Sequence, residues 1–346
     1  MSTLPNTSIK HLRTVEALRA WRRPLRDTQR LVSLVPTMGA LHAGHLSLIR
    51  AAALRSHHVV VSLFVNPTQF GAGEDLATYP STWDADVRQL AELDRELADD
   101  GVNLGRVSAV FHPSAADMYP SGVPSQAADA EGSFVTVSPV GSVLEGASRP
   151  TFFRGVATVC MKLFNAVQPD AAYFGQKDVQ QTVVVRRMVS DFLLDTRVVV
   201  VPTERDPADG LALSSRNVYL GRRRRAVSTV LYRALGAARA AYAEGGHTSR
   251  RELMGRADAV VEAVLQEQWA LGPKERTLFE VDYISLADPD TMQEVESVDP
   301  EKGAVLSGAI KMLPVEEANE GEDLGHSGGP AVRLIDNIIL EPRKDD

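Results

Sequence analysis

The first two hundred residues alternate between short apolar runs and helical patterns, and this alternation constrains the fold more than any other feature. Leu31–Val35 and Val59–Val65 are apolar, β-branched runs typical of buried strands. Between them, Gly44–Arg55 carries apolar residues at helical spacing. The order strand, helix, strand predicts a β-α-β unit with two parallel strands and a right-handed crossover.

The same alternation continues to residue 202. The further segments are a helix near Trp83–Asp99, a strand at Ser108–Pro113, a helix near Val156–Val167, a strand at Ala171–Gly175, a helix near Gln180–Val189 and a final strand from Arg197. Strands that alternate with helices favour a doubly wound parallel sheet. We therefore predict a Rossmann-like α/β domain over residues 1–202.

Composition changes after Pro202, which predicts a second, smaller α+β domain over residues 203–346. Two alanine-rich helical patterns are followed by three strand patterns, at Ala226–Ala243, Arg250–Gln268, Phe279–Leu286, Gly303–Leu313 and Ala331–Leu340. The acidic, Gly-rich tract Val315–Gly329 is expected to be a mobile loop. The basic run Arg222–Arg225 precedes a helical pattern and is interpreted as a solvated helix start.

Charge and cysteine content limit the class of protein. The 346 residues include 37 Lys and Arg against 45 Asp and Glu, a net charge of −8, which disfavours binding to duplex nucleic acid or an anionic membrane. The single cysteine, Cys160, excludes an internal disulfide and is expected to be a buried, inert thiol. No run approaches the roughly 20 apolar residues of a membrane span, and the N-terminus lacks a signal-peptide pattern, so we expect a cytoplasmic protein.

The segment PTMGALHAGH, Pro36–His45, joins the first strand to the first helix and carries two histidines. His42 and His45 have i, i+3 spacing at a helix N-terminus, where backbone N–H groups and the helix dipole favour an anion. Gly39 and Gly44 allow the backbone to approach a phosphate closely. Binding of nucleotide phosphates is favoured over two surface histidines that cap a turn, and a metal site is disfavoured because no third ligand lies nearby.

The loop after the second strand contains uncharged amides and carboxylates. Asn66 and Gln69 can both donate and accept hydrogen bonds, which suits a small ligand with hydroxyl and carboxylate groups. Asp84 and Asp86 could supply oxygen to a hydrated Mg²⁺. An ordinary Asn-Pro turn and solvated carboxylates at a helix N-terminus are the alternatives.

Two later loops carry positive charge. Lys177, in FGQKDVQQ, follows a strand and a glycine and can place a point charge on phosphates. Ser214, Ser215 and Arg216, in DGLALSSRNVYL, can hold phosphate oxygens and neutralise developing charge. Each loop also has a purely structural interpretation. Lys177 could be an ordinary surface lysine, and the second loop could be an N-capped helix with a solvated Arg216. Together the four loops predict a site for a nucleoside triphosphate and a small polar acid.

The motifs of these loops, in order, resemble those of the pantothenate synthetase (pantoate–β-alanine ligase) family from about Ile9 to Leu340. The matching segments are PTMGALHAGH, FVNPTQF, FRGVATV with KLFN, FGQKDVQQ, DGLALSSRNVYL and RLIDN. H-x-G-H alone would indicate only the wider nucleotidyltransferase superfamily, whereas FVNPTQF, GQKDVQQ and SSRN together are far more specific.

The resemblance implies an ATP-dependent condensation of (R)-pantoate with β-alanine that yields pantothenate, AMP and pyrophosphate. The pantoate carboxylate would attack the α-phosphorus of ATP, and the amine of β-alanine would then attack the resulting pantoyl adenylate. The resemblance also implies Mg²⁺ with the ATP, a homodimer formed through the N-terminal domain, and a C-terminal domain that closes over the site.

The resemblance assigns roles residue by residue. His42, His45, Lys177 and Arg216 are the implied catalytic residues, with His45 as the proton donor. The implied ATP-binding residues are Met38, Gly39, Ala40, Leu41, His42, Ala43, Gly44, His45, Gly175, Gln176, Lys177, Asp178, Leu213, Ser214, Ser215 and Arg216. Gln69 is implied to bind pantoate and then β-alanine, Gln181 to bind pantoate, Asn66 to shape that pocket, and Asp86 to associate with magnesium.

The sequence departs from the family pattern at three places. Phe152 stands where the family usually has His, the segment Arg205–Gly210 is one residue longer, and Val315–Gly329 looks like an insertion. Two other functions remain as alternatives: a nucleotidyltransferase that releases a stable nucleotidyl product, and a catalytically silent nucleotide-binding protein. Gln69 with Gln181 disfavours the first, and intact His42, His45 and Lys177 disfavour the second.

Overall fold

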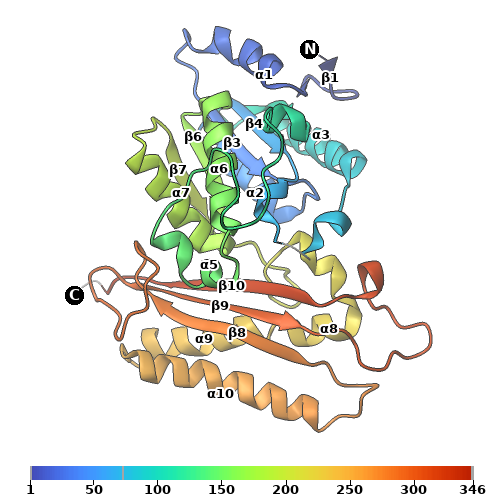
Figure 1. Cartoon of the computed structure of the whole chain (residues 1–346), viewed down its shortest axis with the longest axis vertical. Coiled ribbons are helices and arrows are strands. Elements are labelled where there is room, and N and C mark those ends of the chain that lie inside the picture. The colour runs from blue at the N-terminus through green and yellow to red at the C-terminus, as the bar shows by residue number, and fades with distance from the viewer. Residues whose placement is uncertain (1, 72–73, 344–346) are drawn as a thin grey trace. The chain divides into compact units, whose positions relative to one another are not determined.

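The computed structural model describes residues 2–71 and 74–343, and the chain divides into two compact units. The first unit takes in the chain up to Ser142 together with Gly146–Gln176 and Gln180–Glu204. The second unit takes in Arg205 onward, with the short segments Val143–Glu145 and Lys177–Val179. Figure 1 shows the strands and helices of both units.

A seven-stranded sheet forms the centre of the first unit, in the order β1-β2-β5-β4-β3-β6-β7. The strands are β1 (Ser2–Thr3), β2 (Lys10–Leu12), β3 (Val32–Thr37), β4 (His58–Leu63), β5 (Arg106–Phe111), β6 (Ala171–Gly175) and β7 (Arg197–Val201). All neighbours from β2 to β7 pair in parallel, and only β1 is antiparallel to its neighbour β2. The predicted parallel sheet is confirmed.

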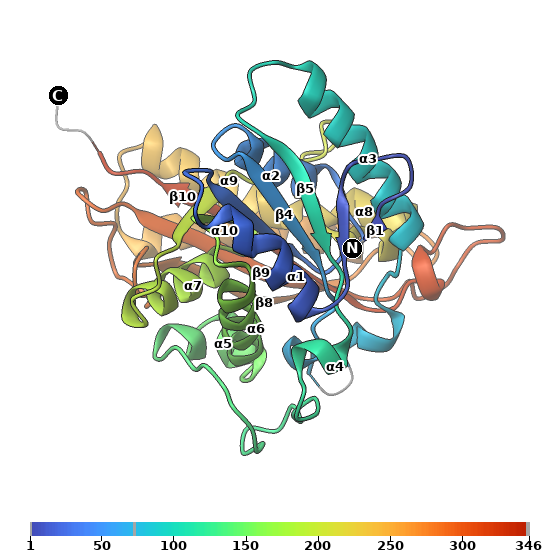
Figure 2. The same cartoon turned by 90° about the horizontal axis from the view of Figure 1, so that it is seen from above.

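Helices cover both faces of this sheet. The helices in this part of the chain are α1 (Val15–Arg22), α2 (Ala43–Ala53), α3 (Trp83–Asp99), α4 (Ala115–Met118), α5 (Glu145–Ser148), α6 (Phe152–Val167) and α7 (Val179–Asp191). Figure 2 shows α2 and α3 on one face, with α1, α6 and α7 on the other. Apolar side chains of β3, β4 and β5 pack with α2 and α3 in one buried cluster, so the buried runs of the sequence lie between layers.

The secondary structure matches the sequence patterns closely. α3 has the predicted bounds, and the predicted strands lie within two residues of the observed ones. β2 was not predicted, because a strand of three residues has no detectable period. The eight-residue helix α1 was not predicted either. The Thr14 side chain accepts a hydrogen bond from the backbone N–H of Ala17 and so caps α1.

The second unit is a three-stranded antiparallel sheet covered by helices. Its elements are α8 (Gly221–Ser228), α9 (Val230–Ala243), α10 (Arg250–Trp269), β8 (Phe279–Ala287), β9 (Ala304–Met312) and β10 (Val332–Leu340). The strand order is β10-β9-β8, and apolar residues of α9 and α10 pack on the sheet. The first predicted helix, Ala226–Ala243, is divided at Thr229 into α8 and α9.

Short 3-10 helices occupy several loops. They are η1 (Arg23–Leu25), η2 (Pro67–Gln69), η3 (Asp75–Thr78), η4 (Val140–Ser142), η5 (Gln176–Asp178), η6 (Ser215–Tyr219) and η7 (His326–Gly328). Three of them, η2, η5 and η6, lie in motifs that the sequence analysis singled out.

The arginine run begins α8 as expected and Arg222 is exposed, but Arg223 and Arg224 are not solvated, so that part of the interpretation is wrong. Arg224 is only 1% exposed, and its guanidinium donates to the backbone carbonyls of Leu220, Leu324 and Pro330. Arg223 forms an ion pair with Glu322. These arginines thereby anchor the acidic tract Val315–Gly329 to α8, a role that charge composition alone does not reveal.

Two further expectations concern Cys160 and membrane insertion. Cys160 lies buried in α6, and burial raises the pKa of its thiol to about 12, so the thiol is inert as predicted. Among the described residues, every helix is too short or too polar to cross a lipid bilayer.

Candidate active site

The sheet places three of the four candidate loops at one edge. From β3 the chain proceeds through β4 to β5 in one direction, whereas β6 and β7 lie on the other side of β3. Since the strands are parallel, the carboxyl ends of β3, β4 and β6 meet at the same edge, where the strand order reverses. Crevices at this position are the usual ligand sites of open α/β sheets.

The loop after β3 has a left-handed turn that a carboxylate holds in place. Gly39 and Ala40 have φ of +84° and +50°. The next two backbone N–H groups along this turn, of Ala40 and Leu41, donate to the Asp86 carboxylate over 3.0 and 2.8 Å. The Leu41 carbonyl accepts from Nε2 of Gln89 at 3.2 Å. α3 therefore fixes the shape of this loop from the side.

The two histidines follow this turn at the start of α2. His42 is the N-cap, and its Nδ1 accepts the backbone N–H of Gly44 at 3.2 Å. An Nδ1 that accepts carries no proton, so the neutral ring carries its proton on Nε2. The ring centroids of His42 and His45 are 4.1 Å apart, and both rings are half-buried. The predicted pairing of the two imidazoles at a helix N-terminus is therefore present.

Asp86 is buried rather than exposed in a cleft. It is 3% exposed, and its carboxylate also accepts the Thr82 hydroxyl at 3.1 Å. Burial raises the pKa of Asp86, against the lowering effect of these hydrogen bonds. No group of three or more His, Cys, Asp or Glu side chains in residues 2–71 and 74–343 is arranged to hold a metal. Asp86 thus fits a direct protein-bound Mg²⁺ poorly.

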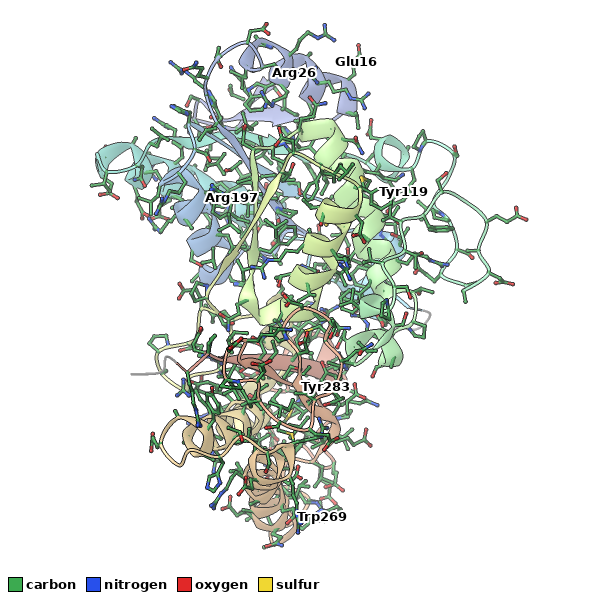
Figure 3. All side chains as sticks on the ribbon, turned by 90° about the vertical axis from the view of Figure 1, so that its left-hand side faces the viewer. Glu16, Arg26, Tyr119, Arg197, Trp269 and Tyr283 are labelled. Atoms are coloured by element: carbon green, nitrogen blue, oxygen red, sulfur yellow. The ribbon has the colours of Figure 1, made fainter. Side chains whose placement is uncertain are left out.

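A buried polar network follows β4 and orients the Gln69 side chain. Nδ2 of Asn66 donates to Oε1 of Gln69 at 3.0 Å and to the Gly155 carbonyl at 3.3 Å. Oδ1 of Asn66 accepts the hydroxyls of Tyr119, labelled in Figure 3, and Thr68, at 2.5 and 3.1 Å. Because Oε1 of Gln69 is an acceptor in this network, Nε2 is the hydrogen-bond donor of this side chain.

Helix α6 packs directly against this network. A Cβ on Gly155 would lie 2.0 Å from the Thr68 carbonyl oxygen, so only glycine allows this approach. Arg149, just before α6, donates to the Gln69 carbonyl at 3.1 Å and pairs with Glu74. Its guanidinium lies 3.8 Å from the ring centroid of Phe152, the residue that stands where the family usually has His.

The end of β6 and the start of α7 carry the third motif. Gly175 ends β6, and Gln176 begins the short helix η5. Gln180 is buried and donates to the Val140 carbonyl at 2.8 Å, so it has a structural role. Gln181, the predicted pantoate ligand, is half-buried one position further along α7.

The second unit holds the charged residues of the motif around Lys177. Nζ of Lys177 lies 3.6 Å from Oδ1 of Asp178. The backbone carbonyl of Lys177 accepts a hydrogen bond from Nδ2 of Asn337 at 2.8 Å. Arg205 forms a two-pronged ion pair with Asp336 at 2.6 and 2.8 Å. The RLIDN motif on β10 thus supplies the partners of both segments.

The SSRN motif forms the 3-10 helix η6. The Ser214 hydroxyl accepts the backbone N–H of Arg216 at 3.3 Å, and Nδ2 of Asn217 donates to the Ala212 carbonyl at 3.0 Å. Leu213, Ser214, Ser215 and Arg216 are all half-buried. The segment is therefore internally capped, with part of each side chain accessible.

Sequence reasoning did not find several residues that support these loops. Tyr119, Thr68, Gly155 and the pair Arg149–Glu74 contact residues far from them in sequence. Thr68 and Gly155 lie in the FVNPTQF and FRGVATV motifs, but threonine and glycine carry no specific chemical signal. Only the three-dimensional contacts reveal their roles.

Comparison with known proteins agrees with this arrangement. Residues 10–339 match the model of the pantoate–β-alanine ligase family. A pantothenate synthetase from Herpetosiphon aurantiacus is 42% identical over 329 residues, which cover 94% of this chain and 98% of that protein. A pantoate–β-alanine ligase from Saccharomyces cerevisiae is 40% identical over 341 residues, 96% of this chain and 100% of that protein.

Solved structures show the same fold. A pantothenate synthetase from Thermus thermophilus has a TM-score of 0.76 and 37% identity, over 96% of this chain and 100% of that one. The Francisella tularensis pantoate–β-alanine ligase, complexed with β-γ ATP and β-alanine, has a TM-score of 0.66 and 28% identity, over 96% of this chain and 97% of that one. By family match, sequence identity and fold, this chain belongs to the pantoate–β-alanine ligase family.

Proposed function

We propose that this ligase joins pantoate to β-alanine through a pantoyl adenylate. In the first step, a pantoate carboxylate oxygen attacks the α-phosphorus of ATP, and the bond to pyrophosphate breaks. In the second, the amine of β-alanine attacks the acyl carbon, loses a proton and displaces AMP. A carboxylate is a poor electrophile, and the adenylate supplies a good leaving group, so the protein mainly positions reactants and stabilises charge.

The loop after β3 is our candidate for the ATP phosphate site. The backbone of Met38–Leu41 would face the phosphates, and the first turn of α2 presents the positive end of the helix dipole. His42 adds an Nε2–H donor, which follows from its Nδ1 contact with Gly44. His45, on the same helix turn, is the proposed proton donor. The F. tularensis relative was solved with an ATP analogue, which supports ATP as the nucleotide.

The amide network after β4 is our candidate for the acid substrate. Nε2 of Gln69 is a donor, which suits the carboxylate or hydroxyl oxygens of pantoate. Asn66 holds that amide in orientation, and Gln181 would add a second one. The F. tularensis structure contains β-alanine, which supports β-alanine as a substrate, and Gln69 is the proposed ligand of pantoate and β-alanine in turn.

The motifs around Lys177 and Arg216 would supply the remaining charges. Lys177 is the proposed phosphate contact and Asp178 the proposed ribose contact. Ser214, Ser215 and Arg216 would bind the phosphates and neutralise the charge that develops there. Gly175 and Gln176 would complete the nucleotide site, beside the carboxyl end of β3.

We propose that Mg²⁺ arrives with ATP, held by phosphate oxygens and water. This agrees with the described residues, which contain no cluster of three metal-binding side chains, and with a buried Asp86 already bonded three times. The ion would lower the charge density of the triphosphate.

The observation that carries the proposal is the pairing of two sites on adjacent strands. The imidazole pair at the α2 N-terminus follows β3, and the Gln69 amide follows β4, its parallel neighbour. The test is product formation by the purified protein with ATP, Mg²⁺, pantoate and β-alanine. We expect pantothenate and AMP in equal amounts, and neither product when any one substrate is omitted. A stable nucleotidyl product would favour the nucleotidyltransferase alternative. No turnover would favour the catalytically silent nucleotide-binding protein.

We also propose a cytoplasmic homodimer. The single, buried Cys160 suits a reducing compartment because it cannot form an internal disulfide. Light scattering after gel filtration measures the oligomeric state directly, and a monomeric mass would contradict the dimer.

A further inference from the structure

Asp86 binds the loop Met38–Leu41, which we call the ATP loop, although Asp86 lies 45 residues beyond Leu41 in the sequence. Its Oδ2 accepts the N–H of Ala40 at 3.0 Å and its Oδ1 the N–H of Leu41 at 2.8 Å. Asp86 lies in the first turn of α3, which begins at Trp83. The Trp83 ring stacks on His112 with a centroid distance of 4.3 Å and contacts His11 in a tilted arrangement at 4.7 Å. The Asp86 carboxylate therefore projects from a helix N-terminus whose position is held by the ring contacts of Trp83.

The loop needs such a clamp because its backbone is strained. Ala40 adopts a left-handed φ of +50°, which a residue with a Cβ rarely does. Its predecessor Gly39 has φ +84°, and a Cβ there would lie 3.1 Å from Oδ2 of Asp86. Two N–H bonds to one charged acceptor, in a buried place, are strong enough to keep this turn.

We infer that Asp86 acts in this enzyme as a positioning residue that shapes the ATP loop, not as a ligand of the magnesium ion. The inference rests on the proposed function, since it takes Met38–His45 as the phosphate site. Asp86 is 3% exposed, and its two oxygens already accept three hydrogen bonds. A carboxylate in this state determines where the phosphate-binding N–H groups point.

Asp84 provides a matched control. It belongs to the same first turn of α3, carries the same charge and is exposed. A long-range effect of charge on Mg²⁺ or ATP would appear in both Asp84→Asn and Asp86→Asn. A positioning effect would appear only in Asp86→Asn, where an amide NH₂ replaces an oxygen that accepts a backbone N–H.

The first experiment is hydrogen exchange of the ligand-free protein over residues 38–45. In Asp86→Asn, we expect the amides of Ala40 and Leu41 to exchange at least about tenfold faster than in the wild type, because bonds to a charged acceptor are lost. Asp84→Asn should match the wild type. Unchanged exchange in Asp86→Asn would overturn the inference, whatever reaction the protein catalyses.

The second experiment is steady-state kinetics in which ATP, β-alanine and Mg²⁺ are varied one at a time. We expect Asp86→Asn to lower kcat/KM for ATP about 100-fold through misplacement of the loop, with the KM for β-alanine and the Mg²⁺ concentration for half-maximal rate unchanged. Recovery of the rate by excess Mg²⁺ would instead identify Asp86 as a metal ligand. If Asp86→Asn fails to fold, Thr82→Val is the second variant, because it removes one hydrogen bond to the Asp86 carboxylate. It should show the same changes in amide exchange and in kcat/KM for ATP, but smaller ones. Wild-type values of both quantities in Thr82→Val would count against the inference.

These two experiments separate the inference from the proposed function. Turnover by the wild type and Asp84→Asn tests the ligase reaction alone. Hydrogen exchange tests the clamp alone.

Discussion

At the scale of single residues, the two histidines differ in their structural duties. His42 caps α2 through its Nδ1, whereas His45 lies within the first turn and is not needed to begin the helix. A substitution of His42 would therefore affect both activity and helix capping, and the loss of the cap would lower the free energy of unfolding by about 1 kcal/mol. His45 is the better probe of chemistry.

We expect His45→Ala to lower the rate of adenylate formation about 100- to 1,000-fold, with an almost unchanged melting temperature, because it removes the proposed general acid. Single-turnover formation of AMP-linked product measures this rate. A matched control is His247→Ala, which removes a histidine that pairs with Glu252 in the second unit. Near-normal turnover by a folded His45→Ala would refute the proton-donor role.

Gln69 tests the substrate pocket in the same way. We expect Gln69→Ala to raise the KM for pantoate at least about tenfold, because one or two hydrogen bonds to pantoate are lost. The KM for ATP should change much less. Tyr119→Phe should give a smaller shift of the same kind, because it removes one of two hydroxyls that hold Asn66. An equal loss of affinity for both ligands would mean that the pocket lies elsewhere.

At the scale of elements, α6 fixes the pocket through one glycine. Gly155 contacts the η2 segment so closely that any side chain would displace Thr68 and, with it, the Gln69 amide. The same helix carries Phe152 under Arg149, so its first turn also bears on the Gln69 carbonyl. The substrate site therefore depends on packing as much as on polar groups.

We expect Gly155→Ala to destabilise the fold by about 1–3 kcal/mol through overpacking, and to raise the KM for pantoate. The control is Gly236→Ala in α9, where an added Cβ meets nothing within 4 Å. That substitution should stabilise by about 0.4–1 kcal/mol through loss of unfolded-state entropy. Chemical denaturation measures both, and a neutral Gly155→Ala would contradict the close contact.

The elements around Trp83 also predict a pH dependence of stability. Burial, with the Arg13 charge, lowers the pKa of His11 and of His112 below the ordinary 6.5. The unfolded chain therefore takes up protons at a higher pH than the folded one, so stability is full above pH 6.5 and falls as the pH decreases through that value.

The measurement is the melting temperature of wild type and His112→Phe between about pH 7.5 and 5.5. The phenyl ring keeps the stacking on Trp83 but cannot titrate, so the variant should lose less stability on acidification. Asp86, whose pKa burial raises, acts in the opposite direction in both proteins and cancels in the comparison. Parallel curves would show that His112 does not titrate differently on folding.

At the scale of the whole molecule, the sequence predicts layers and loops better than it predicts contacts. The parallel sheet, the two helix-rich patterns of the second unit and the position of each motif after a strand all follow from periodicity and turn residues. The burial of Arg224 could not be predicted, because three of its partners are backbone carbonyls 89 to 106 residues further along the chain. The partners of Asp86 and Asn66 were hidden for the same reason.

The central claim concerns the order of chemical events across the molecule. The measurement that tests it most directly is exchange between ATP and pyrophosphate with Mg²⁺ and pantoate, in the absence of β-alanine. The account predicts exchange that depends on pantoate, since a reversible adenylate forms before the amine arrives. If pantothenate and AMP form on adding β-alanine but no exchange precedes it, the adenylate does not form alone, and the two-step account is contradicted.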